Sequence, residues 1–253
     1  MTTSAVRLIV IILTLYVACK IAVLWRGPRP TGGSLCVYLL WPGMDTRPFL
    51  RRSPHRGWPW LGRGLIGLGL GVAGTVALRW AAPHLGRYAV GWLGVAVFLT
   101  AVHLGFADLL SGGLRRAGYP VRRLFRDPLR SRSLAEFWSR RWNLAYVELT
   151  RMLFLPPLRR WLGRVAVPAA FLLSGVLHEL AISVPVNAWY GGPLAYFGLH
   201  AVLTTAESRL RIHRWPVALA RLWTWLAILA PLPLLFHTPF REALVTPLFW
   251  SGS

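Results

Sequence analysis

The sequence predicts an all-α protein: a polytopic integral membrane helical bundle of about six spans, with an amphipathic helix on its cytoplasmic side. Long apolar runs, a shortage of charge and an alternation of arginine-rich and charge-poor loops carry this prediction. Of the 253 residues, 55% are hydrophobic and only 15% are charged. A soluble domain carries about 25% charged residues, so lipid is expected to be the main solvent of this chain.

Six apolar stretches approach the length of about 20 residues that a helix needs to cross a hydrocarbon core. They are residues 5–25, 60–82, 88–110, 165–186, 193–206 and 215–236. The first is kept as a span because no small-residue cleavage site followed by a polar domain is visible. The fifth is short, so we expect a tilted or half-buried helix. Without an internal repeat, residues 1–253 are interpreted as a single membrane-embedded domain.

The net charge of +21 comes from 29 basic residues against 8 acidic ones. The basic residues stand in blocks between apolar runs, which is the pattern of a membrane protein rather than a nucleic-acid-binding one. The segment 115–164 alone holds 13 arginines and three acidic residues. The alternation of charged and uncharged loops predicts that this segment is cytoplasmic and contacts anionic lipid.

Two local patterns predict how one helix packs and where another begins and ends. Gly67 and Gly71 in the second span have the spacing at which small residues let helices approach closely. In the middle segment, Ser133 and Glu136 form a capping box that predicts a helix start. Apolar residues then recur at helical spacing until Pro156-Pro157, which should end this amphipathic surface helix.

Few ionisable residues lie deep in a span, and His178 with Glu179 is the main pair. A zinc-protease motif would need a second histidine at position 182, which is Ile182, so no metal site is predicted. A neutral histidine can take the proton of a lipid hydroxyl as that oxygen attacks an acyl thioester. An amide such as Asn143 could then donate to the oxyanion.

Non-catalytic interpretations of these residues stay open. His178 can be a core histidine whose hydrogen bonds are satisfied across helices, and Asn143 can be a polar residue on a solvated face. Ser174 precedes His178 by one helical turn, so a Ser–His nucleophile pair is a further alternative, although no orienting acid is identified.

Two motifs together resemble a known family. Residues 137–143 read Phe-Trp-Ser-Arg-Arg-Trp-Asn, and residues 174–180 read Ser-Gly-Val-Leu-His-Glu-Leu. The first resembles the Phe-Trp-x-x-x-Trp-Asn signature of membrane-bound O-acyltransferases, and the second resembles the segment that carries their catalytic histidine. The wax synthase branch and its bacterial members are most similar, over about residues 38–207. Ser139 stands where that branch commonly has glycine.

The resemblance implies a long-chain-alcohol O-fatty-acyltransferase in a bacterial inner membrane, with His178 as general base and Asn143 as the substrate-orienting or oxyanion-binding residue. The implied partners are acyl-CoA, a lipid alcohol and membrane lipids, without nucleic acid, metal or prosthetic cofactor. The residues expected to bind substrate are Trp138, Arg140, Arg141, Trp142 and Glu179. For the CoA phosphates, Arg159 with Arg160 is an alternative to Arg140 with Arg141, and the two tryptophans can instead anchor the helix at the interface.

A second function class competes with the enzyme. In a transporter of lipids or small molecules, His178 and Glu179 would form an intramembrane proton relay. The small number of acidic residues in the spans and the absence of matched broken helices argue against it.

Overall fold

The computed structural model describes residues 2–53 and 56–250, which form helices and turns without a strand. The predicted all-α class is therefore confirmed. The chain divides into two compact units. The first comprises the described residues of Met1–Arg26 and Arg126–Phe240, and the second those of Gly27–Phe125 and Arg241–Ser253.

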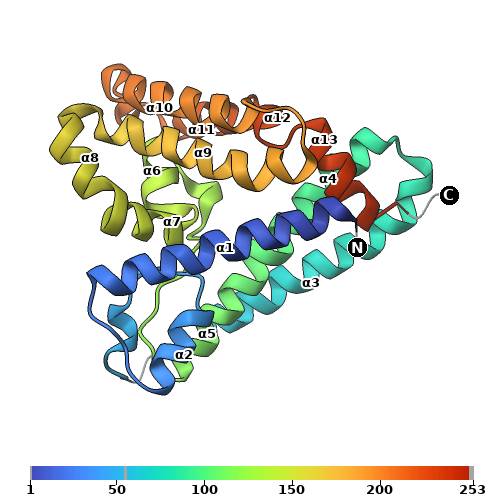
Figure 1. Ribbon diagram of the computed structural model, residues 1–253. Helices are drawn as coiled ribbons and strands as arrows, with labels where there is room; N and C mark the ends of the chain where they lie inside the picture. The colour runs from blue at the N-terminus through green and yellow to red at the C-terminus, as the bar shows by residue number, and fades with distance from the viewer. Residues whose placement is uncertain (1, 54–55, 251–253) are drawn as a thin grey trace. The chain divides into compact units, whose positions relative to one another are not determined.

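The first unit joins the N-terminal helix to the second half of the chain (Figure 1). Its α-helices are α1 (Thr3–Arg26), α6 (Leu134–Glu136), α7 (Leu144–Leu149), α8 (Leu155–Leu162), α9 (Ala166–Val186), α10 (Gly192–Leu210), α11 (Val217–Leu229), α12 (Leu232–Leu235) and α13 (Thr238–Phe240). The π-helical turns η5 (Phe137–Arg141) and η6 (Thr150–Phe154) and the 3-10 turns η4 (Pro128–Arg130), η7 (Gly163–Val165) and η8 (Ile212–Arg214) lie between them. Helices α9 and α10 form an antiparallel hairpin, and α1 packs against α9.

The second unit is built around two long helical segments. Its α-helices are α2 (Gly33–Leu40), α3 (Trp58–Ala81), α4 (Arg87–Leu99) and α5 (Ala107–Arg116). The π-helical turn η3 (Thr100–Phe106) joins α4 to α5, and the turns η1 (Arg47–Phe49), η2 (Ala82–His84), η9 (Arg241–Val245) and η10 (Thr246–Leu248) complete the unit. Inside it, the Asp108 carboxylate accepts two hydrogen bonds from Arg123, at 2.8 and 2.7 Å, which neutralises a buried charge.

Within residues 2–53 and 56–250, five helical segments are long and apolar enough to cross a membrane. They are Thr3–Arg26, Trp58–His84, Arg87–Arg116, Leu144–Val186 and Val217–Leu235. The first four segments contain the first four predicted spans, and the fifth covers most of the sixth predicted span, residues 215–236. The fifth predicted stretch forms α10, a helix of 19 residues that lies outside this set, as its short apolar run suggested. The protein is a polytopic helical membrane protein.

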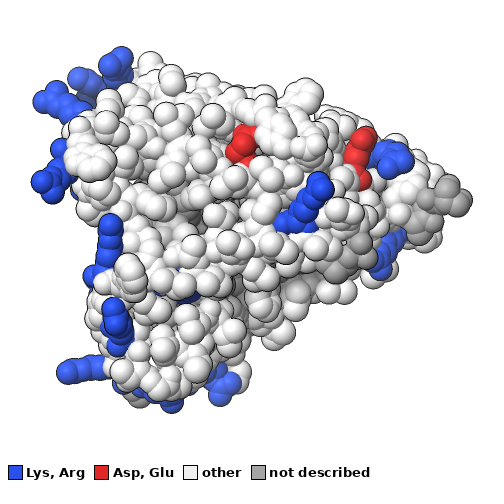
Figure 2. Space-filling model, viewed as in Figure 1, with Lys and Arg blue, Asp and Glu red and all other residues white. Residues whose placement is uncertain are grey.

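The surface agrees with a lipid environment. Large apolar side chains of α1 and α3 are widely exposed, for example Leu13 at 56% and Leu65 at 63%. Figure 2 shows broad uncharged areas on one face, with most of its charged side chains basic. Such apolar surface would be unfavourable in water and is expected against acyl chains.

The middle segment corrects one prediction. Ser133 caps a helix as expected, because its Oγ accepts a hydrogen bond from the Glu136 N–H at 3.0 Å. However, the helix does not run on to Pro156-Pro157: it breaks after η5, where Trp142 is extended and Asn143 has a left-handed φ of 43°. The two prolines lie in the first turn of α8, where a helix needs no backbone N–H donor.

The glycine prediction for α3 is confirmed in the second unit. Gly64, Gly67 and Gly71 are buried against the α4–η3–α5 segment. A β-carbon at position 67 would lie 2.9 Å from the backbone of Gly105, whereas one at Gly69 would meet no atom within 4 Å. The glycines on this face of α3 therefore allow backbone-to-backbone packing.

The Gly67→Leu substitution is expected to destabilise the second unit, because the side chain would force α3 away from η3 at a cost of about 1–3 kcal/mol. We expect a fall of several degrees in the apparent unfolding temperature in detergent. Gly69→Leu adds the same side chain on the open side of the same helix and should leave that temperature near wild type. Equal effects of the two substitutions would contradict the packing described here.

Candidate active site

Helices α9 and α10 are tied together next to the turn that joins them. The carboxylate of Glu179 on α9 accepts hydrogen bonds from the backbone N–H groups of Gly191, at 2.8 Å, and Leu194, at 3.2 Å. These groups lie at the start of α10, where a helix has unpaired donors and the positive end of its dipole. The structure thus gives this predicted substrate-binding residue an anchoring role.

The hairpin is tight enough to bring side chains of both helices into one cluster. Gly175 allows the approach, because a β-carbon there would lie 3.0 Å from the Cα of Leu194. One turn further along α9, the His178 ring packs on Phe197 of α10 with ring centroids 4.4 Å apart. A histidine in the membrane segment is thereby fixed against an aromatic ring.

The hydrogen bonds of His178 define its tautomer. Its Nδ1 lies 2.8 Å from the backbone carbonyl oxygen of Ser174. A carbonyl oxygen only accepts, so the proton of the neutral ring lies on Nδ1 and the lone pair lies on Nε2. The Ser174 hydroxyl is 3.5 Å from the same Nδ1. Because that nitrogen donates to the carbonyl, the arrangement does not favour the Ser–His nucleophile pair.

A cavity of about 820 Å³ lies in the first unit, within the range of about 300–1,000 Å³ typical of small-molecule sites. It follows η7 and α9 from Arg164 to Ser174, and α10 from Phe197 to Arg209. Ten residues of helix span roughly 15 Å, so the cavity is elongated. His178 is not among the lining residues, but Ser174 and Phe197, which contact its ring, are.

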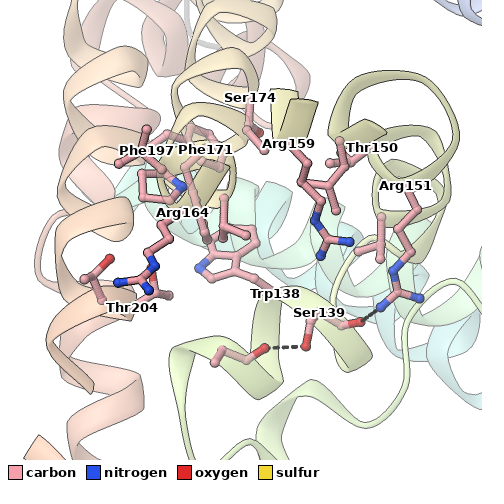
Figure 3. A pocket seen from close by; sticks show the side chains of 18 of the residues that line it. Trp138, Ser139, Thr150, Arg151, Arg159, Arg164, Phe171, Ser174, Phe197 and Thr204 are labelled. Atoms are coloured by element: carbon pink, nitrogen blue, oxygen red, sulfur yellow. Dashed lines mark hydrogen bonds between the residues drawn. The ribbon is translucent and has the colours of Figure 1, made fainter. Parts of the chain in front are cut away.

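The two ends of the cavity differ in chemistry, because one end is basic and the other lies next to the His178 ring. Four exposed arginines line it, namely Arg151, Arg159, Arg164 and Arg209, and no acidic residue does. Figure 3 shows the guanidinium groups of Arg151, Arg159 and Arg164 turned toward the cavity. Guanidinium groups bind phosphate through paired charge-assisted hydrogen bonds. The cavity can therefore hold a molecule with an anionic head at the arginines and a reactive group near His178.

Both π-helical turns of the first unit contribute to the cavity wall. Trp138 and Ser139 come from η5, and Thr150 and Arg151 come from η6. A π-helical turn widens the helix locally and is frequent at functional sites. The helical spacing of the apolar residues predicts a regular helix here, so these turns and the contribution of Thr150 and Arg151 to the cavity wall were not predicted.

The signature residues 137–143 divide between packing and the cavity. Phe137 is 3% exposed and stacks on Trp142 with centroids 5.4 Å apart. Trp138 lines the cavity. Asn143 caps α7, because its Oδ1 accepts a hydrogen bond from the Tyr146 N–H at 3.2 Å. Neither of the two residues predicted to be catalytic lines the cavity. Ser174 and Phe197, which contact the His178 ring, do line it.

The two predicted phosphate-binding arginines of the signature lie elsewhere. Arg141 is ion-paired with Glu136 at 2.6 Å. Burial raises the pKa of Glu136, but hydrogen bonds from the Arg132 backbone and the Arg141 guanidinium outweigh it and hold that pKa below its ordinary value. Arg140 is exposed and lines a smaller cavity of about 370 Å³, together with Arg132 and His213. Of the alternative pair, Arg159 lines the larger cavity and Arg160 does not.

Two further buried polar residues on α10 organise this region. His200, which is 0% exposed, accepts a hydrogen bond from the Trp138 indole at 3.0 Å. Glu207 accepts hydrogen bonds from the N–H groups of Leu134, at 2.7 Å, and Ala135, at 3.1 Å, so its charge stabilises the start of α6. His200 lies within the fifth predicted apolar stretch, residues 193–206, and Glu207 directly follows it.

Comparison with known proteins supports the resemblance. The profile of the membrane bound O-acyl transferase family matches residues 121–198, a range that includes Trp138, Asn143 and His178. The chain is similar to the probable long-chain-alcohol O-fatty-acyltransferase 7 of Arabidopsis thaliana. The two are 36% identical over 107 residues, which cover 37% of this chain and 32% of the relative.

Two other plant relatives have the same kind of partial match. The long-chain-alcohol O-fatty-acyltransferase of Simmondsia chinensis is 32% identical over 93 residues, which cover 33% of this chain and 26% of the relative. Diacylglycerol O-acyltransferase 1A of Glycine max is 25% identical over 206 residues, with 70% and 40% coverage. The chain spans about a third of the length of the first relatives it matches, 32% in each case.

The left-handed cap at Asn143 yields a stability prediction. Asn143→Ala removes the capping oxygen, at about 1 kcal/mol, and places a β-carbon without a local hydrogen bond in left-handed backbone. We expect Asn143→Ala to lower the apparent unfolding temperature, whereas Asn143→Asp, which keeps an acceptor oxygen, stays close to wild type. An alanine variant as stable as wild type would show that this cap does not hold the start of α7.

Proposed function

We propose that this protein is a membrane O-acyltransferase that moves a fatty acyl group from acyl-CoA to the hydroxyl of a long-chain alcohol or another lipid alcohol. The single observation that carries the proposal is the position of His178, whose Nδ1 donates to the Ser174 carbonyl at 2.8 Å and leaves Nε2 basic beside an arginine-lined cavity. The similarity to named O-acyltransferases supports the same reaction.

The donor is best accommodated with its phosphates at the arginines. Arg151, Arg159, Arg164 and Arg209 offer several guanidinium forks to the anionic end of acyl-CoA. Trp138, Phe171 and Phe197 offer an apolar wall between that end and His178. The thioester would thus run along the cavity to Ser174 and Phe197, the lining residues that contact the His178 ring. The arginines expected from the signature itself would contribute less.

The reaction needs one base and no external proton. Nε2 of His178 takes the proton of the acceptor hydroxyl as its oxygen attacks the thioester carbonyl. The tetrahedral intermediate then collapses and expels the CoA thiolate, to which Nε2 returns the proton. The products are an ester and free CoA, with His178 neutral again. This chemistry requires no metal or prosthetic cofactor.

Asn143 is proposed as the donor to the oxyanion, as the resemblance implies. Its cap uses Oδ1, so the amide nitrogen is the group available for donation. Because Asn143 does not line the cavity, this role needs a movement of η5 or α7 when substrate binds. The Asn143→Asp variant keeps the capping oxygen and removes the amide, so it separates the two roles.

The transporter alternative has less support. A proton relay would need Glu179 or Glu207 to exchange protons with His178. Both carboxylates instead accept backbone hydrogen bonds at helix starts, at 2.7 to 3.2 Å. The long-chain alcohol as acceptor stays a prediction that rests on similarity to other proteins. The bacterial inner membrane as location stays a prediction too, and the relatives named above are plant proteins.

Replacement of His178 is the direct test of the mechanism. Membranes with wild type should convert labelled palmitoyl-CoA and a pool of hydroxyl lipids into an ester detected by mass spectrometry. His178→Ala should lose at least about 100-fold of that rate, the usual contribution of a general base. His178→Gln serves as a second polar replacement, and insertion of each variant is checked by detergent extraction. Wild-type rates in either variant would refute the assignment of the base.

A further inference from the structure

His200 is a second histidine in the same hairpin, and the reaction above does not use it. It lies on α10 one turn from Phe197 and is 0% exposed. Its Nδ1 accepts the Trp138 indole N–H at 3.0 Å, and its ring packs on Tyr196 with centroids 4.4 Å apart. Because Nδ1 accepts, the proton of the neutral ring lies on Nε2, the reverse of the tautomer of His178.

The need to fill space does not explain a histidine at this position. The Nε2 of His200 is buried and has no hydrogen-bond partner within the described part of the chain. A buried donor without a partner costs stability, so an apolar residue of similar size would be favoured there if packing were the only role. The polar group that is used is Nδ1, and its partner is Trp138.

Trp138 links His200 to the cavity. The indole lines the cavity between the arginines and Ser174, and Figure 3 shows it beside Phe171 and Phe197. Its ring meets Phe171 edge to face with centroids 6.1 Å apart, and it lies 5.5 Å from Phe197. The aromatic contacts pack the faces and edges of the indole, and the hydrogen bond from Nε1 adds a directional constraint on its orientation.

We propose that His200 is a positioning residue: its Nδ1 holds the Trp138 indole as a fixed wall and so sets the width of the passage along which the acyl-CoA arm reaches His178. The inference rests on the proposed function and deepens it. It assigns to the Trp138–His200 pair the recognition of the donor and not of the acceptor alcohol, because the wall stands between the arginine end and the catalytic histidine.

Two conservative substitutions separate the two ring nitrogens. Asparagine places an oxygen close to the position of Nδ1 and keeps an acceptor for the indole. Glutamine places its amide nitrogen near the position of Nε2 and keeps that donor instead. The proposal predicts that His200→Asn behaves like wild type and that His200→Gln behaves like His200→Leu, which has no polar group.

The kinetic readout distinguishes a positioning role from a structural one. His200→Leu should raise KM for palmitoyl-CoA by roughly five- to tenfold, the size of one lost hydrogen bond, with little change in kcat or in KM for the alcohol. In a Trp138→Phe background the same substitution should have no further effect, because the donor N–H is already absent. Additive losses, or rescue by glutamine and not by asparagine, would overturn the proposal.

A binding measurement keeps this test separate from the proposed function. A thioether analogue of palmitoyl-CoA, which cannot transfer its acyl group, should raise the apparent unfolding temperature of wild type and His200→Asn, and much less that of His200→Gln. If wild type makes no ester yet shows this pattern, the proposed reaction fails while the positioning role stands. Equal stabilisation of all the variants would contradict the positioning role, whatever the esterification assay gives.

Discussion

The carboxylate of Glu179 holds the start of α10 beside α9, and the arrangement of the site follows from that attachment. Gly191 and Leu194 donate to it at 2.8 and 3.2 Å, so the charge of this carboxylate is met by the positive end of a helix. The register set there brings Phe197 onto His178 and places His200 three residues further along α10. Without it, the His178 ring would have no fixed aromatic partner on α10.

Hydrogen-bond direction then divides the polar groups by role. His178 donates through Nδ1 and keeps a basic Nε2, whereas His200 accepts through Nδ1 from Trp138. Glu207 accepts from the start of α6 and from the Trp223 indole at 2.9 Å, which seats the η5 turn near α10. The same few interactions that join α6, α9 and α10 also place Trp138 on the cavity wall and His178 next to its lining.

Composition and run length were enough to predict the helical membrane class, and five of the predicted spans correspond to apolar helices. Those features depend on the transfer of side chains into lipid, which each segment expresses locally. The break at Asn143 was not predictable, because a left-handed asparagine leaves the helical spacing of the neighbouring apolar residues intact. The prolines at 156–157 were misjudged since proline is compatible with both a helix end and a first turn.

The site was predicted in part, because its key residues lie in motifs but its walls do not. His178 and Trp138 belong to recognisable patterns. Arg151 and Arg164, by contrast, come from the separate turns η6 and η7, and among 29 basic residues nothing local marks them. Arg141 was misleading for the opposite reason: it lies inside the signature, yet it is ion-paired with Glu136.

Photo-crosslinking with a palmitoyl-CoA analogue that carries a diazirine close to the thioester tests the account most directly. Peptides of α9 and α10 from the lining of the cavity should be labelled, and excess unlabelled palmitoyl-CoA should abolish that labelling. Such a result would place the thioester beside His178, where the account requires it. Competed labelling confined to other helices, such as α3 or α4, would contradict the assignment of this cavity as the donor site.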